Sequence, residues 1–486
     1  MGFGGLYISI SGINANKKAL DTVSHNIANV NNPNYVRQSV IHRETSYSTG
    51  NIRFQKGTGV NVQQIRQIRD EFLDVKLRRE MASFGYYNTK STILNQVESI
   101  FNEITSSGLQ NVMDEFWDGW SELLKEPDSL TIRGIVHENA VALTTTVNHI
   151  STQLKDLQFN LNREMLNKAK EVNTLLEEIV VLNKNIKLAE GHGPHVTAND
   201  YRDQRNAALD RLSELIPISH YENQYGEEIV SLFGKDLVGG DIYNPIEIKL
   251  NNKGHGEIYW SDTGQSIDLK GLGELGGYID ARDKVVVEYV QRLNILVGEI
   301  AQGVNEIHMT GKSLDWKEGD LPEEIPFFII TDPKDPSGTI KVNPALEDFR
   351  KIAVSQSGDK GDGEKAKEIL NLREELLFGR YSEYEFDEGG YTYAGDELHM
   401  NIDGFYRELV LSIGLERQQA RTMVENQGIL ITQILNRRQE VSSVSLDEEM
   451  TDMLKYQHSY IANSRVINAI DEMIENIVNR MGIVGR

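Results

Sequence analysis

The sequence contains no cysteine in its 486 residues. This absence excludes disulfide bonds, thiol catalysis and thiolate metal sites together. The sequence also lacks an apolar run long enough to span a membrane. Its N-terminus, MGFGGLYISISG, has no basic stretch followed by a continuous apolar core, which is the pattern of a secretory signal. We therefore expect a protein that, if it leaves the cell, does so by another route.

Positive charge is scarce as well. Fifty Lys and Arg residues stand against 73 Asp and Glu residues, a net charge of −23, which argues against nucleic acid because phosphate binding needs clustered basic residues. Residues 1–69, however, carry eight basic and two acidic residues, a net of +6, so the remainder carries −29. Either this segment is an arm that docks on acidic neighbours, or it is a solvated surface with a chance asymmetry.

Both ends of the chain carry apolar residues at helical spacing. Neither predicted helix can bury its stripe alone, so each needs the other terminus or the same helices of neighbouring subunits as a partner. A chain that keeps both ends for helix–helix contact is typical of a building block. The residues predicted for this assembly interface are Leu6, Ile10, Ile13, Leu20, Val23 and Ile27 near the N-terminus and Leu446, Met450, Met453, Leu454, Tyr460, Ile467, Ile474 and Val478 near the C-terminus.

The length suggests two to four domains, and the pattern between the ends is mainly helical with a smaller β part. Long helices are expected over Arg69–Phe101, Ser129–Glu190, Tyr278–His308 and Asn401–Arg438, and shorter ones around Phe116–Leu124 and over Ala198–Leu215. Ser445 should open the last helix in a capping box with Glu448. Residues 216–270 form a β-rich insertion, because they alternate short β-branched runs with Gly and Asn.

The motifs that could carry chemistry are weak. Gly271–Gly276 matches the dinucleotide-binding spacing, but no second strand follows at the required distance, so a flexible lead into a helix is the better interpretation. His192 and His195 are three residues apart, but a solvated loop is favoured because no further ligand cluster accompanies them. No nucleophile setting or carboxylate pair stands out. We expect no catalytic, cofactor or metal site, and no enzyme.

Two terminal segments resemble signatures of the flagellar axial proteins, the family of rod, hook and hook-associated proteins. Ala19–Gln38 matches the N-terminal signature, with Asn34 where the family usually has Gly. The stretch from Ser445 to Asn479 looks like the C-terminal one, in which Glu449 also aligns. Internal segments Phe116–Leu130, Tyr201–Ile216 and Gly273–Asn294 resemble the hook-associated members. The signature residues taken as candidates are Asn26, Asn29, Pro33, Tyr35, Arg37, Asp447, Glu448, Tyr456 and Gln457.

The resemblance implies a structural subunit of the bacterial flagellum at the junction between hook and filament. It implies export from the cytoplasm through the flagellar type III channel, without a cleaved signal peptide, to an extracellular location. The implied partners are further copies of the chain in a ring, the hook protein, a second junction protein, and a cytoplasmic export chaperone on the C-terminal helix. No nucleic acid, membrane or cofactor is expected.

The resemblance also implies an architecture. Terminal helices from 1–60 and 434–486 pair in an inner, coiled-coil-like domain. Residues 61–215, 271–310 and 400–433 form a long antiparallel helix bundle, 216–270 a small β-rich outer domain, and 311–399 an irregular segment of either. Two alternatives stay open. Another axial protein, such as a distal rod or hook subunit, is less favoured because of the helices between Ser129 and Leu215; a dinucleotide-binding enzyme is disfavoured by the Gly271–Gly276 context.

Overall fold

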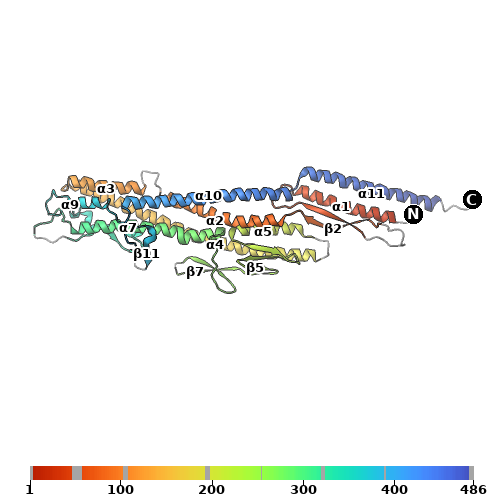
Figure 1. Ribbon diagram of the computed structural model, residues 1–486, viewed down its shortest axis with the longest axis horizontal. Coiled ribbons are helices and arrows are strands. Elements are labelled where there is room, and N and C mark those ends of the chain that lie inside the picture. Colours follow the sequence, from red (N-terminus) through yellow and green to blue (C-terminus); the bar gives the residue numbers. More distant parts are fainter. Residues whose placement is uncertain are drawn as a thin grey trace, which may run out of the picture. The chain divides into compact units, whose positions relative to one another are not determined.

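A computed structural model describes residues 4–45, 57–101, 108–191, 197–252, 254–318, 323–387 and 390–480 (Figure 1). Contacts within the chain divide it into two compact units. We call Met1–Gly85, Asn167–Leu275 and Glu425–Arg486 the terminal unit, and Tyr86–Leu166 and Gly276–Val424 the middle unit. Helices that contribute residues to both are α2 (Glu71–Phe101), α4 (Leu130–Glu190), α6 (Gly273–Asp280) and α10 (Ile402–Ser442).

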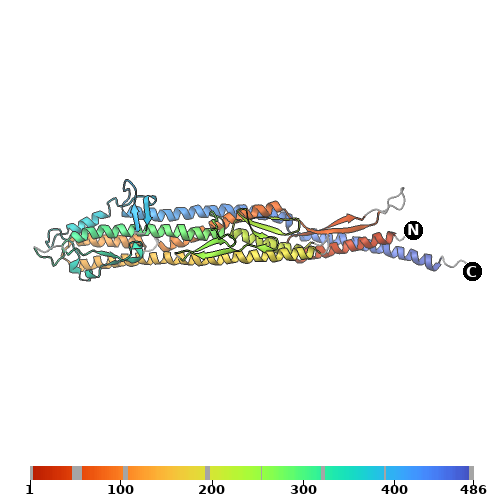
Figure 2. The same cartoon turned by 90° about the horizontal axis from the view of Figure 1, so that it is seen from below.

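The terminal unit holds both ends of the chain. Helices α1 (Gly4–Ala28) and α11 (Leu446–Arg480) lie side by side in both views (Figures 1 and 2). Helix α1 ends just before the turn that contains Pro33, as expected of a residue that cannot continue the ladder. A third helix of this unit, α5 (Asn199–Leu215), buries Leu209, Leu212 and Leu215 on one face.

The strands of the terminal unit form three small antiparallel sheets. Strands β1 (Gln38–Glu44) and β2 (Val60–Gln67) pair, with a register shift between Ile41 and His42. A four-stranded sheet follows, in chain order β3 (Ser219–Glu222), β4 (Glu228–Leu232), β5 (Lys235–Gly239) and β6 (Ile242–Tyr243). Strand β4 buries Val230 and Leu232, while the residues between them and before them on the other face are half-buried. The third sheet is the pair β7 (Ile246–Leu250) and β8 (Gly256–Trp260).

The middle unit packs around an aromatic cluster on α3 (Leu109–Lys125). Phe116, Trp117 and Trp120 are all buried, and the ring centroids of Trp120 and Phe327 lie 5.4 Å apart. These aromatics are spaced so that they share one face of the helix, and in the structure that face lies in the core. The other elements are the π turn Ala281–Val285, α7 (Val286–Thr310), β9 (Phe328–Ile330), α8 (Pro336–Thr339), β10 (Ile340–Val342), α9 (Glu364–Leu372), β11 (Tyr384–Asp387) and β12 (Gly390–Tyr393).

The predicted fold class, mainly helical with a smaller β part, is confirmed. One local expectation differs from the structure. The helix expected over Tyr278–His308 begins earlier, at Gly273, and contains a π turn. Asn34, which stands where the family usually has Gly, lies in a turn and has no left-handed backbone, since positive φ among the described non-glycine residues is confined to Phe233, Lys270 and Glu324. The finer division into four parts stays a prediction.

None of the helices in the described part of the chain is both long enough and apolar enough to cross a membrane.

Candidate functional site at the chain termini

The two terminal helices approach each other through small residues. The buried face of α1 includes Ser9, Gly12, Ala15 and Ala19. A methyl group added at Gly12 would lie 2.7 Å from the Oδ1 atom of Asn463 on α11. Because the distance between two packed helices depends on the side chains at their contact, this small-residue face allows α1 and α11 to come close. The pairing of the two termini within one chain therefore uses the side of α1 that carries Gly12.

The residues predicted for the assembly interface lie mostly beside this contact. Of those on α1, Val23 is buried, Ile10 is 40% exposed, and Leu6, Ile13, Leu20 and Ile27 are half-buried. Of those on α11, Met453, Ile467 and Ile474 are half-buried, whereas Leu446, Met450, Leu454, Tyr460 and Val478 are exposed. Large apolar side chains thus flank the small-residue contact and remain accessible. Their use as an interface between copies stays a prediction.

A buried asparagine joins the turn after α1 to the start of α11. The Nδ2 atom of Asn26 donates to the carbonyl oxygen of Gln38 and to Oε2 of Glu449, at 2.9 Å each. Its Oδ1 atom accepts from the Tyr35 hydroxyl at 2.8 Å and from the Gln38 N–H at 3.0 Å. All four hydrogen-bonding positions of the amide are used, and Asn26 is 1% exposed. Asn26 therefore connects helix α1, the segment from Tyr35 to Gln38 and the start of α11.

Arg37 makes the second connection between the termini. Its Nε atom donates to Oε1 of Glu449 at 2.6 Å, and its Nη1 atom to Oε2 of Glu448 at 2.7 Å. Its backbone N–H donates to the carbonyl oxygen of Ser442 at 2.9 Å. Burial lowers the pKa of Arg37, but the hydrogen bonds and charges of the two glutamates outweigh it, so the pKa is raised overall. Glu448 thus pairs with Arg37, whereas the sequence had predicted a capping box for it.

The structure brings four signature residues together and leaves the others apart. Asn26, Tyr35, Arg37 and Glu448 form the cluster described above. Asn29 binds the His25 carbonyl oxygen through its Nδ2 atom at 3.0 Å, and the ring of Tyr456 lies 6.2 Å from that of His42. Of the signature residues outside this cluster, Pro33, Asp447 and Gln457 are exposed.

Glu449 is the central residue that the sequence argument missed. The resemblance aligned it, but no role was assigned to it. In the structure it is 1% exposed and accepts from both Asn26 and Arg37. A glutamate at the start of a helix is ordinarily solvated and favoured there by the helix dipole. Its spacing alone therefore could not show that it is buried against residues more than 400 positions away.

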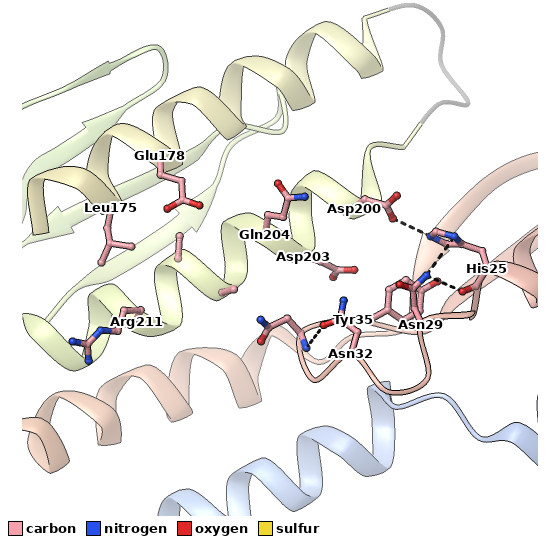
Figure 3. A pocket seen from close by; sticks show the side chains of 13 residues that line it. His25, Asn29, Asn32, Tyr35, Leu175, Glu178, Asp200, Asp203, Gln204 and Arg211 are labelled. Atoms are coloured by element: carbon pink, nitrogen blue, oxygen red, sulfur yellow. Dashed lines mark hydrogen bonds and ion pairs between the residues drawn. The ribbon is translucent and has the colours of Figure 1, made fainter. Parts of the chain in front are cut away.

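A hollow of about 520 Å³ lies between the turn after α1 and helices α4 and α5 (Figure 3). Figure 3 shows Glu178 on α4 and Gln204 on α5 at its walls, and Asp200 directed to His25. The distance from Oδ1 of Asp200 to Nε2 of His25 is 3.2 Å. The wall residue Arg211 is held by Glu171, Glu214 and Glu274 at 2.6–3.2 Å. The hollow is therefore polar, with several acceptor oxygens.

Asp203 lies at the edge of this hollow and is almost fully buried. Its Oδ1 atom accepts from Nε2 of Gln67 at 2.6 Å, and its Oδ2 atom from the N–H of Val36 at 3.4 Å. Burial raises the pKa of Asp203 to about 7, against the opposing effect of these hydrogen bonds and of Arg69. Burial together with the charges of Asp200, Asp203 and Glu449 also raises the pKa of Tyr35. The turn after α1 is therefore bonded to the carboxyl group of Asp203, whose two hydrogen-bond donors are both uncharged.

Two weak sequence motifs remain, the glycine-rich segment Gly271–Gly276 and the histidine pair. Gly273 has φ +74°, and a methyl group there would lie 2.3 Å from the carbonyl oxygen of Leu215. Close packing against that carbonyl therefore requires this glycine, which is the first residue of α6 within the Gly271–Gly276 segment. His192 and His195 lie outside the described residues. Over the ranges that the structure describes, no three His, Asp or Glu residues are grouped to hold a metal ion.

Comparison with known protein families gives three matches along the chain. The model of the flagellar hook-associated protein FlgK helical domain matches residues 94–321. The model of the flagella basal body rod protein matches residues 6–35, and that of the flagellar basal body rod FlgEFG protein C-terminal region matches residues 436–481. The two terminal matches cover most of α1 and all of α11, and they include Asn26, Tyr35, Glu448 and Glu449.

Whole-chain relatives agree with these matches. Flagellar hook-associated protein 1 of Bacillus subtilis is 31% identical, over 100% of this chain and 99% of the relative. The protein of the same name from Escherichia coli is 20% identical over 97% of this chain and 98% of its own length. The structure of the flagellar hook junction protein FlgK from Burkholderia pseudomallei shares the fold, with a TM-score of 0.60 and 14% identity over 76% of this chain and all of that chain. The chain therefore belongs to the flagellar hook-associated protein 1 family, a family of structural proteins of the bacterial flagellum.

Proposed function

We propose that this protein is the structural subunit that joins hook to filament, and that copies assemble in a ring through α1 and α11. The observation that carries the proposal is the outer face of α11. Leu446, Met450 and Leu454 are 48%, 52% and 54% exposed, although the same helix packs on α1 with another face. Because α11 already packs on α1 with another face, we expect this exposed apolar row to contact a helix of a neighbouring molecule.

The energetics favour contact between copies. Full burial of a Leu or Met side chain contributes about 1.5–3 kcal/mol, and these three are about half exposed, so a neighbour that covers them gains a few kcal/mol. Residues 1–60 and 434–486 would form the inner assembly part. The long helical part (61–215, 271–310 and 400–433), the β-rich insertion (216–270) and the segment 311–399 would form the rest of the subunit.

The same apolar row bears on export. Before assembly it would be exposed in the cytoplasm, where it is an aggregation hazard. We propose that a cytoplasmic chaperone covers the segment from Leu446 to Met481 until the chain leaves through the flagellar type III channel without a cleaved signal. In the extracellular flagellum its neighbours would be further copies, the hook protein and a second junction protein.

The test is complementation of a strain that lacks the gene for this protein. The strain should keep intact hooks and shed unpolymerised filament protein, and the wild-type chain should restore filaments. Met450→Glu with Leu454→Glu should leave hooks bare. The matched control is Leu411→Glu with Leu415→Glu, which changes two exposed leucines of α10 (64% and 58%) and should support filaments. Wild-type filament numbers with the α11 double variant would contradict the proposal.

The alternatives are separated by other measurements. If the chain were a rod or hook subunit, the deletion strain would lack hooks instead of bearing bare ones. If the Gly271–Gly276 loop bound a dinucleotide, titration with a nicotinamide cofactor would release heat. The packing of Gly273 against the Leu215 carbonyl oxygen favours a structural role for that loop.

A further inference from the structure

Carboxylates around the hollow of Figure 3 lack a cationic partner. Glu178 is exposed and makes no hydrogen bond or ion pair with any other described residue. Asp203 is 7% exposed and accepts only from the neutral groups of Gln67 and Val36. A buried carboxylate without a cation is costly, because the desolvation of its charge is only partly offset by neutral donors.

The cations nearby are already committed. Arg211, on the wall, contacts three glutamates, and Arg69, whose charge acts on Asp203, pairs with Asp74. The rest of the wall supplies amide groups from Asn29, Asn32 and Gln204. Carboxylate and amide oxygens around a hollow of about 520 Å³ fit a guanidinium or ammonium group, which carries several N–H donors and a positive charge.

We propose that this hollow receives an Arg or Lys side chain from a second copy of the chain. The inference rests on the proposed function, since it requires self-assembly. Two observations identify the second copy as the source. The rim of the hollow is the turn that follows α1, so the hollow continues the surface proposed to contact neighbours. The segment 1–69 has a net charge of +6, and in it Lys17 and Arg43 are exposed and form no ion pair among the described residues.

Charge reversal tests the proposal in the full-length protein. Glu178→Lys should lower the fraction of hooks that carry a filament about tenfold, the effect of roughly 1.4 kcal/mol on an assembly equilibrium. Glu177→Lys is the matched control, because Glu177 is exposed on the same helix and does not line the hollow. It should behave as wild type. Glu178→Lys combined with Arg43→Glu or with Lys17→Glu should recover filaments.

Cysteine pairs give an independent measurement, because the natural chain has no cysteine. Glu178→Cys with Arg43→Cys, or with Lys17→Cys, should yield disulfide-linked dimers in assembled flagella and none in the dilute monomer. The same partners combined with Glu177→Cys should crosslink much less. Circular dichroism of each purified variant shows that it is folded.

The outcomes separate the two proposals. Loss of filaments with Glu178→Lys, recovery in a double variant and selective crosslinking would support docking in the hollow. If wild-type protein restores filaments but Glu178→Lys behaves as Glu177→Lys, the docking proposal is overturned and the proposed function stands. Failure of both double variants to recover filaments, with no selective crosslink, overturns it equally. Failure of the wild-type chain to restore filaments would overturn the proposed function itself.

Discussion

Glu449 connects the two ends of the chain, because it accepts from both Asn26 and Arg37 while almost fully buried. Glu449→Ala would leave those donors without an acceptor. We expect the free energy of unfolding, measured with urea, to fall by about 2–4 kcal/mol. Glu448→Ala is the control. The Glu448 side chain is 64% exposed, so its pair with Arg37 should contribute less than about 1 kcal/mol. Equal losses of unfolding free energy in the two variants would contradict the conclusion that Glu449 connects the two ends of the chain.

His308, in the middle unit, should make stability depend on pH. Its Nδ1 atom bonds the Ile325 carbonyl oxygen at 2.7 Å, and its Nε2 atom accepts from the Ala353 N–H at 2.9 Å, an arrangement that needs a neutral ring. Burial lowers its pKa to about 4. The ordinary pKa of a histidine side chain is about 6.5. Between about pH 6.5 and pH 4, His308 therefore binds a proton in the unfolded chain but not in the folded chain. Stability should therefore fall by about 3 kcal/mol as the pH falls through this range.

The measurement is urea unfolding at pH 7, 5.5 and 4 for the wild type and for His308→Gln. Other groups titrate in both proteins, so the difference between the two pH profiles isolates His308. The wild type should lose more stability toward pH 4 than the variant. Parallel profiles would show that the imidazole does not titrate as its burial requires.

At the scale of single residues, the sequence predicted which positions belong to the terminal signatures but not what they contact. Asn26, Tyr35 and Arg37 were identified by resemblance, and the structure gathers them. Their common partner, Glu449, lies more than 400 residues away in the chain. No local pattern encodes a contact of that separation, because helical spacing specifies a face and not its partner.

At the scale of elements, the bend before α6 depends on Gly273. Gly273→Ala would place a methyl group 2.3 Å from the Leu215 carbonyl oxygen at φ +74°. Left-handed backbone costs about 1–2 kcal/mol in a residue with a side chain, and the overlap adds about 1–3 kcal/mol. Gly264→Ala is the control, since Gly264 has φ +65° and open space around it. Thermal unfolding should show a clearly larger loss for Gly273→Ala, and equal losses would be inconsistent with this packing.

Long helices were the elements that periodicity predicted best. The helix expected over Ser129–Glu190 spans Leu130–Glu190, and the one expected over Ala198–Leu215 spans Asn199–Leu215. The π turn at Ala281–Val285 was not predicted. Tertiary contacts hold it, because Gln158 donates to the Arg282 carbonyl oxygen and the Arg282 guanidinium reaches Asn162. A local pattern that is helical throughout gives no sign of such contacts.

The choice of face on α1 was also beyond the sequence. Spacing favoured the large apolar residues, whereas in the structure Gly12 lies against Asn463 of α11 and Gly5 against Ile470. Hydrophobic periodicity weights large side chains and overlooks small ones, although small side chains allow the closest approach of two helices. That the large residues serve a second contact stays a prediction.

At the scale of the whole molecule, we propose that α1 and α11 form an assembly module that one chain leaves incomplete. Leu446, Met450 and Leu454 should become covered only when copies meet. Amide hydrogens of the exposed turns of α11 should then exchange faster in the monomer than in the assembly, because few tertiary contacts oppose local opening. The core of the middle unit, around Trp117 and Trp120, should exchange slowly in both states.

Hydrogen exchange of residues 446–478, compared between the dilute monomer and purified hook-junction assemblies, is the most direct test of this account. The middle unit provides the internal reference in each sample. The account predicts that exchange in this segment slows by at least about tenfold on assembly, which corresponds to roughly 1.4 kcal/mol of added protection. Equal protection of the segment in monomer and assembly would contradict the claim that neighbouring copies complete the packing of α11.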